Sequence, residues 1–396
     1  MLTREENETL TRVGRGTPGG QLLRRYWQPV AAAGELTDEK PIKAVKLLGE
    51  ELVVYRDKKG SYGLVGEHCP HRKASLAFGR VDEQGIRCPY HGWKYDHTGK
   101  CLEQPAEPES GGFKDKIKHI AYPVEKLGGL LWAYLGPEPK PLLPRWDVLA
   151  WENGKRWIEK HEIYNCNWLQ PMENSVDPSH LYWLHGEAAY LGRGNRQYEE
   201  KHEFSPFQYG IIKRRISPGF NPSDPPLVDE HPLLFPTMLR LVTLADRGKK
   251  NGRHRHAIQF RLPVDDTHTQ VYRVNFIPSA TDRSPENQDP PYEYRPLKDE
   301  EGNYYMDIVS AQDAMAWETQ GAITDRTLEH IGHGDIGIVM FRRMLREQIE
   351  IVQKGGEPFG IIRDPAKNKI LHVDVYNDTI GLPKGQWQDL VRAKAS

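Results

Sequence analysis

Two short pairs of potential metal ligands stand close together in the first third of the chain. They are Cys69-x-His71 and Cys88-x-x-His91, with sixteen residues between His71 and Cys88. Two thiolates and two imidazoles from a pair of loops can bind a single tetrahedral zinc ion. They can also bind a two-iron cluster, with both thiolates on one iron and both imidazoles on the other. A third interpretation is that these are ordinary buried residues that happen to be neighbours.

The residues around the two pairs favour the two-iron cluster. A proline directly follows each cysteine, and the second pair continues as YHGW at residues 90–93. Zinc fingers and ribbons usually pair Cys with Cys at a spacing of about two to four residues, and neither pair here is Cys-Cys. The pattern closely resembles the Rieske signature, so we expect Cys69, His71, Cys88 and His91 to hold a Rieske [2Fe-2S] cluster. It departs from many such sequences at Lys73, where they carry glycine.

A second group of potential ligands lies in the segment DPSHLYWLHGE, where His180 and His185 have the spacing H-x4-H. On a regular α-helix, residues five apart differ by roughly 140° of rotation, so both imidazoles meet one ion only if the helix is bulged or ends between them. Two imidazoles and one carboxylate on one side of an iron form the facial triad that binds Fe(II) and activates oxygen. The pair by itself also fits surface histidines or hydrogen-bonded core histidines.

The two groups together resemble one family over nearly the whole chain, the Rieske non-heme iron aromatic ring-hydroxylating oxygenases. In that family the pattern N-x-x-D-x-x-H-x4-H carries the first two ligands of a mononuclear iron. Here the four named positions are occupied by Asn174, Asp177, His180 and His185. The resemblance therefore implies that His180 and His185 bind a mononuclear Fe(II).

The third ligand that the resemblance implies is an Asp near the start of a late helix. The pair Gln312-Asp313, followed by Glu318 and Gln320, fits the pattern best, so we expect Asp313 to be the ligand. Asp307 is the alternative. Asp313 also fits a helix cap or a solvated acid.

Asp177 is expected to act without binding metal. In the resembling family this position links a cluster histidine of one subunit to an iron-ligand histidine of the next, which here would connect His91 to His180. A carboxylate between two metal-bound imidazoles fixes both rings by hydrogen bonds. Asp177 also fits the start of a helix. The implied assembly is a homotrimer or a multiple of it.

The resemblance also implies partners for electron supply. The chain has no obvious G-x-G-x-x-G at the start of a βαβ unit, so we expect no nicotinamide site of its own. Electrons would come from NAD(P)H through a separate flavin and iron–sulfur reductase or a ferredoxin. Two rival functions remain, an electron-transfer protein of the Rieske type without oxygenase activity and a zinc-stabilised binding module.

Three segments resemble the phthalate dioxygenase branch of the family, which includes O-demethylases: RRYWQPV (24–30), KDKIKHIAYPV (114–124) and WETQGAITDRTLEH (317–330). This implies oxidation of a small aromatic carboxylate or aryl ether with O2, by ring dihydroxylation or O-demethylation. We expect an arginine of the second domain to hold a substrate carboxylate. The candidates are Arg193, Arg196, Arg214 and Arg215.

Charge and composition exclude several other classes. The 54 basic and 55 acidic residues among 396 give no global bias toward nucleic acid or an anionic membrane. No apolar run reaches the length of a membrane span, and the N-terminus is acidic where a signal peptide would be basic and then apolar. With two of the four cysteines assigned to the cluster, a disulfide framework is not expected. We expect a cytoplasmic protein.

The elements that must position these residues indicate an α+β protein. The segment 136–144, with four prolines in nine residues, predicts a domain boundary. We therefore expect an N-terminal helical segment at 1–41 and a small all-β Rieske domain at 42–144. The catalytic domain at 145–396 is expected to be an antiparallel sheet wrapped by helices in a helix-grip-like arrangement.

Individual elements follow from local signals. Thr3 and Glu6 fit a capping box that opens a helix ending near residue 14 or 16, and a second helical piece is expected at 21–27. The range 42–56 alternates as two strands, and 284–303 is expected to be a polar loop. A long amphipathic helix is expected at 335–354.

Overall fold

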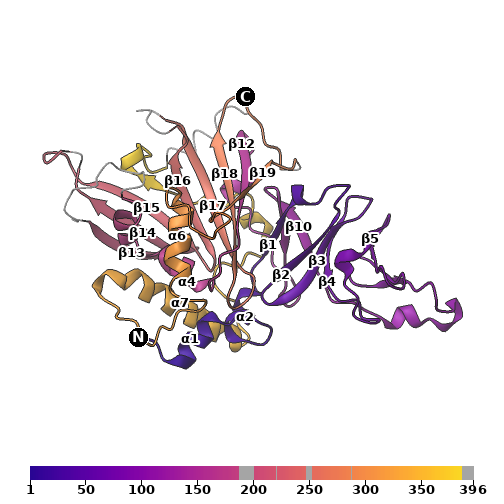
Figure 1. The fold of residues 1–396 in the computed structure, drawn as a ribbon. Helices are drawn as coiled ribbons and strands as arrows, with labels where there is room; N and C mark the ends of the chain where they lie inside the picture. The colour runs from indigo at the N-terminus through magenta and orange to yellow at the C-terminus, as the bar shows by residue number, and fades with distance from the viewer. Residues whose placement is uncertain (187–199, 220, 247–251, 287, 386–396) are drawn as a thin grey trace.

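The computed structural model describes residues 1–186, 200–219, 221–246, 252–286 and 288–385. It has two parts that lie side by side, a smaller one built of short sheets and a larger one built on a broad sheet with helices against it (Figure 1). The described elements agree with the expected α+β class, a small all-β domain beside an antiparallel sheet with helices.

Three antiparallel sheets form the smaller part. The first contains β1 (Gln28–Ala32), β11 (Leu130–Ala133) and β10 (Val124–Leu127). The second contains β2 (Ile42–Leu47), β3 (Glu50–Arg56), β4 (Tyr62–Gly66) and β9 (Ala121–Tyr122). The third contains β5 (Arg80–Val81), β6 (Ile86–Arg87), β7 (Lys94–Tyr95) and β8 (Cys101–Glu103). The third sheet lies at the end of the molecule far from the large sheet (Figure 1).

Strand β3 is buried on both faces, which explains its continuous apolar run. Leu52 and Val54 belong to the main hydrophobic core, whereas Val53 and Tyr55 belong to a separate core that also contains Cys69 and Cys88. Because successive side chains of a strand point to opposite faces, one strand can join both cores. The β2–β3–β4 sheet therefore anchors the cysteine loops to the rest of the molecule.

The large sheet has, in the described residues, the order β13 (Lys201–Phe207), β14 (Gly210–Ser217), β15 (Leu227–Leu234), β16 (Met238–Leu244), β17 (His254–Pro263), β18 (Thr269–Pro278), β12 (Gly154–His161) and β19 (Tyr292–Arg295), with β20 (Tyr376–Asn377) beside β15. The pairings are antiparallel except that of β12 with β19. The helices of this part are α3 (Asp147–Ala150), α4 (Leu169–Asn174), α5 (Ser179–Trp183), α6 (Val309–Glu318) and α7 (Ile336–Gln353). In Figure 1, α4, α6 and α7 lie against the sheet.

Strand β19 corrects the expectation of a polar loop at 284–303. Its residues Tyr292 to Arg295 pair in parallel with Ile158 to His161 at the edge of the sheet. The surrounding prolines and charges conceal this strand in the sequence, because only four residues separate two turn-rich stretches. The two tyrosines alternate with charged residues, as an edge strand permits.

The N-terminal segment begins as expected and then differs. Thr3 and Glu6 form the capping box of α1 (Arg4–Thr11), which ends earlier than expected because Arg12 is extended. The second helix, α2, spans Pro18–Leu23 instead of 21–27, since Thr17 accepts the Gly20 N–H and Pro18 opens the first turn. The following residues lead into β1, so the segment 1–41 also supplies a strand to the smaller part.

Helix α7 matches the long amphipathic helix expected from the sequence. Its buried residues include Phe341, Leu345, Ile349 and Val352, which fall three or four positions apart. This stripe packs on the core, and α7 also contacts α2. Within the described ranges, no helix combines the length and apolar character needed to cross a membrane.

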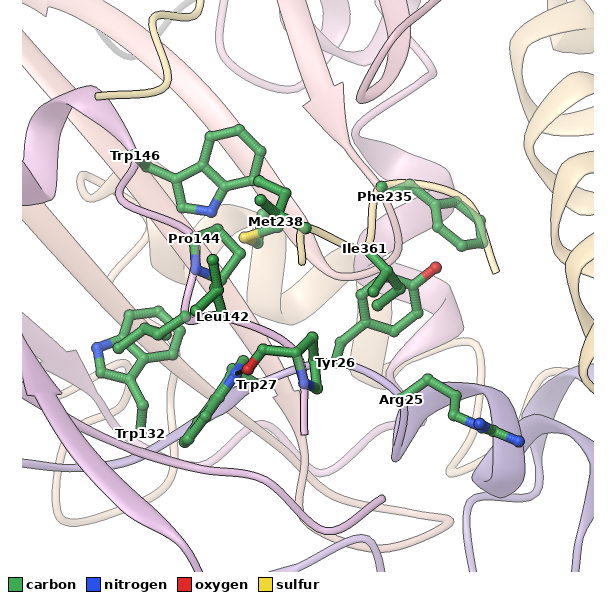
Figure 2. A pocket seen from close by; sticks show the side chains of 14 residues that line it. Arg25, Tyr26, Trp27, Trp132, Leu142, Pro144, Trp146, Phe235, Met238 and Ile361 are labelled. Atoms are coloured by element: carbon green, nitrogen blue, oxygen red, sulfur yellow. Dashed lines mark hydrogen bonds between the residues drawn. The ribbon is translucent and has the colours of Figure 1, made fainter. Parts of the chain in front are cut away.

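The proline-rich segment is packed where distant parts of the chain meet. Trp27 donates its indole N–H to the Pro141 carbonyl at 3.0 Å, and the Leu142 N–H bonds to the Ile362 carbonyl at 2.9 Å. Figure 2 shows Trp27, Trp132 and Trp146 around a small cavity at this junction. Its volume of about 30 Å³ leaves room for about one water molecule. It is a packing gap and no candidate for a substrate site.

Candidate metal centres and active site

The predicted cluster ligands lie on two neighbouring loops, and in each loop the cysteine is more buried than the histidine. Cys69 and Cys88 are buried, at 1% and 4% exposure, whereas His71 is exposed and His91 half-buried. Each loop is closed by backbone hydrogen bonds, from Lys73 to the Cys69 carbonyl at 2.9 Å and from Gly92 to the Cys88 carbonyl at 3.1 Å. The two imidazole rings lie 4.6 Å apart. The thiols therefore point inward and the imidazoles outward.

This arrangement fits a two-iron cluster and does not fit a single zinc ion. Zinc binds four donors at about 2.0–2.3 Å, so those donors must converge on one point. Among the residues that the structure describes, no three of the four donor atoms lie within 4.8 Å of one another. A cluster with thiolates at one end and imidazoles at the other requires this separation. The cysteines are free, with no disulfide between them.

Neighbouring side chains orient the cluster loops. Trp93 stacks on His71 with ring centroids 4.4 Å apart and planes 5° apart. The hydroxyl of Tyr95 lies 3.2 Å from the Cys69 sulfur, and burial raises the pKa of this thiol. Hydrogen bonds to the ligand sulfurs are one means by which a protein sets the cluster potential.

The departure at Lys73 has a structural cost. Lys73 has a φ of 64°, in the left-handed region that glycine adopts without strain. A side chain there costs about 1–2 kcal/mol. The loop nevertheless closes, because the Lys73 N–H still reaches the Cys69 carbonyl. The ligand positions are thus kept in spite of the substitution.

The second predicted group also comes together. Donor atoms of His180, His185 and Asp313 lie within 4.8 Å of one another. Helix α5 ends at Trp183, between the two histidines, as their spacing requires. The rings lie 5.3 Å apart at 85°. Asp313 reaches them from α6, more than one hundred residues later in the chain.

Gln312 fixes the orientation of His185, and sequence reasoning assigned it no role. Its Nε2 donates to the Met306 carbonyl at 2.6 Å, so its Oε1 is the atom that accepts from Nδ1 of His185 at 2.7 Å. Nε2 of His185 then presents a lone pair toward Oδ1 of Asp313, 3.2 Å away. That oxygen is buried without a hydrogen-bond partner. Two facing acceptors need a cation between them, either a proton or a metal ion.

A hydrogen bond also fixes the orientation of the His180 ring. Its Nδ1 donates to the backbone carbonyl of Asp177, which leaves Nε2 as the ligand atom. Burial lowers the pKa of His180 to about 4, so the ring is neutral at pH 7 and able to bind metal. Two neutral imidazoles and one carboxylate are the donor set that suits Fe(II) with open positions. The residues present thus fit a mononuclear iron.

The structure distinguishes between Asp307 and Asp313, the two alternatives for the third iron ligand. Asp307 lies before α6, is exposed, and lines a neighbouring cavity of about 520 Å³, which Asp313 lines as well. Only Asp313 of the two belongs to the group of three donors.

Asn174 and Asp177 flank the same site. Asn174 is the last residue of α4 and lines the cavity into which the three donors open. Oδ1 of Asp177 accepts the Ser179 N–H at 3.0 Å, whereas its Oδ2 lies 3.9 Å from Nδ1 of His180. The first contact agrees with a helix start, and the second places a carboxylate oxygen beside a predicted iron ligand.

A buried ion network holds α4 in place, and no sequence pattern indicates it. Glu173 accepts hydrogen bonds from Arg326 at 2.7 Å and from Arg342 at 2.6 Å. Arg342 also binds Glu329 at 2.7 Å. These charges come from segments more than 150 residues apart, so only the fold pairs them. The network fixes the residue before Asn174.

The three donors open into a cavity of about 370 Å³. This volume is within the range of small-molecule sites. Part of the wall is apolar, including Leu239, Leu241, Val309 and Ile380, and part is basic, including Lys213, Arg215, His231, Arg261 and Arg273. The arrangement suits an aromatic ring that carries a polar group.

The four arginines expected to hold a substrate carboxylate differ in their positions and in their partners. Arg193 and Arg196 lie outside the described residues. Arg214 is not among the residues that line the cavity and forms ion pairs with Glu203 and Glu230. Arg215 lines the cavity, but its guanidinium binds the buried Asp229.

We predict that Gln312→Leu weakens the binding of mononuclear iron by about 10- to 100-fold, because His185 loses the partner that orients its ring. Iron titration of protein depleted of mononuclear iron measures this, with the cluster absorption as an internal standard. Gln320→Leu is the matched control, since Gln320 is exposed and its side chain bonds to the Ala316 carbonyl and the Thr324 hydroxyl, away from the three donors. Equal iron affinity in the Gln312 variant and the wild type would contradict the role.

Comparisons with known proteins agree with the cluster centre. Residues 26–122 match the Rieske [2Fe-2S] domain, and residues 254–390 match the family described as LigXa C-terminal domain like. The first match covers both cysteine–histidine loops.

Similar proteins cover nearly the whole chain. The 5,5'-dehydrodivanillate O-demethylase oxygenase subunit of Sphingobium sp. (strain NBRC 103272 / SYK-6) is 41% identical over 94% of this chain and 86% of its own. The phenoxybenzoate dioxygenase subunit alpha of Ectopseudomonas oleovorans is 36% identical over 89% and 87%. The solved structure of Pseudomonas putida CBB5 NdmA with caffeine has a TM-score of 0.66 at 22% identity, covering 85% of this chain and 93% of that one, which shows a shared fold.

Proposed function

The chain belongs to the Rieske non-heme iron oxygenases as an oxygenase subunit, and from this premise we propose that it oxidises an aromatic carboxylate or an aryl ether with O2. Electrons would come from NAD(P)H through a separate reductase or ferredoxin. The observation that carries the proposal is the meeting of His180, His185 and Asp313 at the wall of a cavity, in a chain that also has a Rieske domain.

When bound, the cluster would supply single electrons and the mononuclear iron would supply oxygen activation. The residues of this chain have complementary tasks. Cys69, Cys88, His71 and His91 would hold the cluster, and His180, His185 and Asp313 the mononuclear iron. The apolar wall excludes water and packs against an aromatic ring, while the basic wall binds its polar substituent.

Asp177 is proposed to connect the two centres between subunits. The cluster loops and the three iron ligands lie in different parts of one chain, the loops near β5 and the ligands near α4 and α6 (Figure 1). A second copy that brings His91 to Asp177 would shorten the path. This is the reason to propose an assembly of several copies, for which the family resemblance implies a homotrimer or a multiple of it. We also propose that the protein is cytoplasmic and that its segments are 1–41, 42–144 and 145–396.

The named activities of the relatives suggest two reactions. O-demethylation would consume the aryl methyl ether, O2, two electrons and two protons, and would yield a phenol, formaldehyde and water. Ring dihydroxylation would use the same electrons and protons and place both oxygen atoms on the ring. The higher identity to an O-demethylase subunit favours the first reaction and a role in aromatic catabolism.

The rival function, electron transfer alone, is not favoured. Such a protein needs neither a second set of metal donors nor a cavity beside it. Both features, together with relatives that are oxygenase subunits, support catalysis.

Turnover with a surrogate reductase tests the proposal. Methoxylated and unsubstituted aromatic acids are offered with NADH, and O2 uptake, formaldehyde and ring diols are measured together. Formaldehyde in proportion to O2 is the expected result. Reduction of the cluster without O2 uptake for any aromatic compound would support the electron-transfer function instead.

A further inference from the structure

Lys213 is a buried charge in the cavity beside the three donors, and it has no partner among the described residues. It lies on β14, is only 4% exposed, and lines the cavity with His180 and His185. In the part of the chain that the structure describes, its ammonium group makes no hydrogen bond and no ion pair. Burying an ammonium group without such a partner is costly. A lysine that only supports the fold would form an ion pair, or would extend its ammonium group to water.

His231 lies directly across the sheet from Lys213. The two residues are opposite each other in the β14–β15 pairing, so their side chains share one face, and both line the cavity. Nε2 of His231 is buried and has no hydrogen-bond partner in the described structure. Two nitrogen atoms with free hydrogen-bonding capacity thus face the same space.

The nearby carboxylate is already engaged by another residue. Arg215, two positions along β14, lies opposite Asp229, and its Nε donates to Asp229 at 2.9 Å. The strand pair therefore carries one matched cation–anion pair and, beside it, a cation that faces the ring of His231, whose pKa burial lowers to about 4. This asymmetry leaves the charge of Lys213 available to a ligand.

Other cations of the cavity have acceptors of their own. Arg261 donates to the Pro171 carbonyl and the Ser175 hydroxyl, and Arg273 has Glu159 at 3.9 Å. Lys213 differs from them in having no acceptor among the residues that the structure describes, so it gains the most from an added anion.

We propose that Lys213, with Nε2 of His231, binds an anionic oxygen of the aromatic substrate, a carboxylate or a phenolate. This inference rests on the proposed function and names the residue that selects the substrate. The anionic oxygen would lie at β14 and β15, with the ring against Leu239 and Leu241, in the cavity that Asp313 also lines. Charge pairing in a buried site gives this contact its strength.

Binding to the purified, cluster-loaded protein tests the assignment without turnover. Calorimetry compares 3-methoxybenzoate with its methyl ester, which removes the charge and adds one methyl group. A second arm uses 2-methoxy-4-nitrophenol, whose nitro group acidifies the hydroxyl, against its methyl ether. Each pair is measured on the wild type and on Lys213→Met. Arg214→Met is the matched control, because Arg214 is the next residue of β14 and does not line the cavity.

Lys213→Met should weaken the binding of the anion by roughly 10- to 100-fold and leave its neutral partner unchanged, as loss of a charge-assisted hydrogen bond predicts. A selective loss in the benzoate arm identifies a carboxylate, and one in the nitrophenol arm a phenolate. Equal effects on anion and neutral partner in both arms, or no preference for either anion in the wild type, would overturn the proposal.

Stability provides a second readout. Removing an unpaired buried charge should leave the melting temperature equal or higher in Lys213→Met and Lys213→Gln, with the cluster spectrum intact. A marked fall in both variants would show that Lys213 supports the fold and would overturn the ligand role. Because these readouts do not use O2, the charge preference can hold even if the oxygenase assay fails, and the two failures are distinguishable.

Discussion

Asp313→Ala should lose the mononuclear iron and all turnover while the visible spectrum of the cluster remains. The physical reason is that Asp313 supplies the single carboxylate of the three-donor group, and its Oδ1 has no hydrogen-bond partner in the described part of the chain. Two imidazoles alone would bind Fe(II) weakly and leave an additional open position. Iron content, the visible spectrum and product formation are measured on the same preparation.

Asp307→Ala is the control for this experiment. Asp307 lies six positions earlier, is exposed, and is not one of the three grouped donors. It should keep both its iron and its turnover. An active Asp313→Ala variant, or loss of iron in Asp307→Ala instead, would transfer the ligand role to Asp307.

Asp177→Asn should retain both metal centres, allow reduction of the cluster, and show almost no turnover. Asparagine has nearly the same size and can still cap α5, but its neutral amide weakens the charged hydrogen bonds that a link between two imidazoles requires. If Asp177 only starts the helix, the cost is at most about 2 kcal/mol of stability, with activity largely kept.

A single-turnover experiment distinguishes the two roles of Asp177. The cluster is reduced, mixed with substrate and O2, and followed by its absorption. Ser179→Ala is the control, because it removes a hydroxyl that donates to Asp177 and keeps the carboxylate. A cluster that stays reduced in the Asn variant but reoxidises in Ser179→Ala supports the link. Normal reoxidation with product in the Asn variant rules it out.

The sequence predicted those parts of the site whose residues lie close together in the chain. Cys69 to His91 form two short loops, so their spacing and flanking residues carry most of the geometry. The spacing of His180 and His185 required a helix end between them, and α5 ends there. The resemblance to a family singled out Asp313, because no local pattern connects it to histidines more than one hundred residues away.

Residues whose role depends on the sheet could not be predicted in this way. In the sequence IIKRRIS, Lys213 is as hydrophilic as Arg214, and only the pairing with β15 decides which of the two is buried. The same register assigns Asp229 to Arg215, which removes that arginine's charge from the expected carboxylate contact. The partners of Glu173 come from two later segments, so they are set by tertiary packing.

Local sequence signals also mispredicted a short edge strand and a helix start, because contacts with neighbouring residues determine both. Strand β19 has only four residues between prolines, and its pairing with β12 makes it a strand. Helix α2 begins at Pro18 because Thr17 caps it, three residues before the expected start. In both cases one specific contact outweighs the average tendency of the segment.

The most direct test of the central claim is to count iron and acid-labile sulfide per chain after anaerobic incubation with ferrous iron and removal of the excess. Two centres in one chain predict about three iron atoms and two sulfides, two irons in the cluster and one at His180, His185 and Asp313. About two iron atoms and two sulfides would mean that the three-donor group holds no iron, and would contradict the assignment of this chain as an oxygenase with its own mononuclear centre.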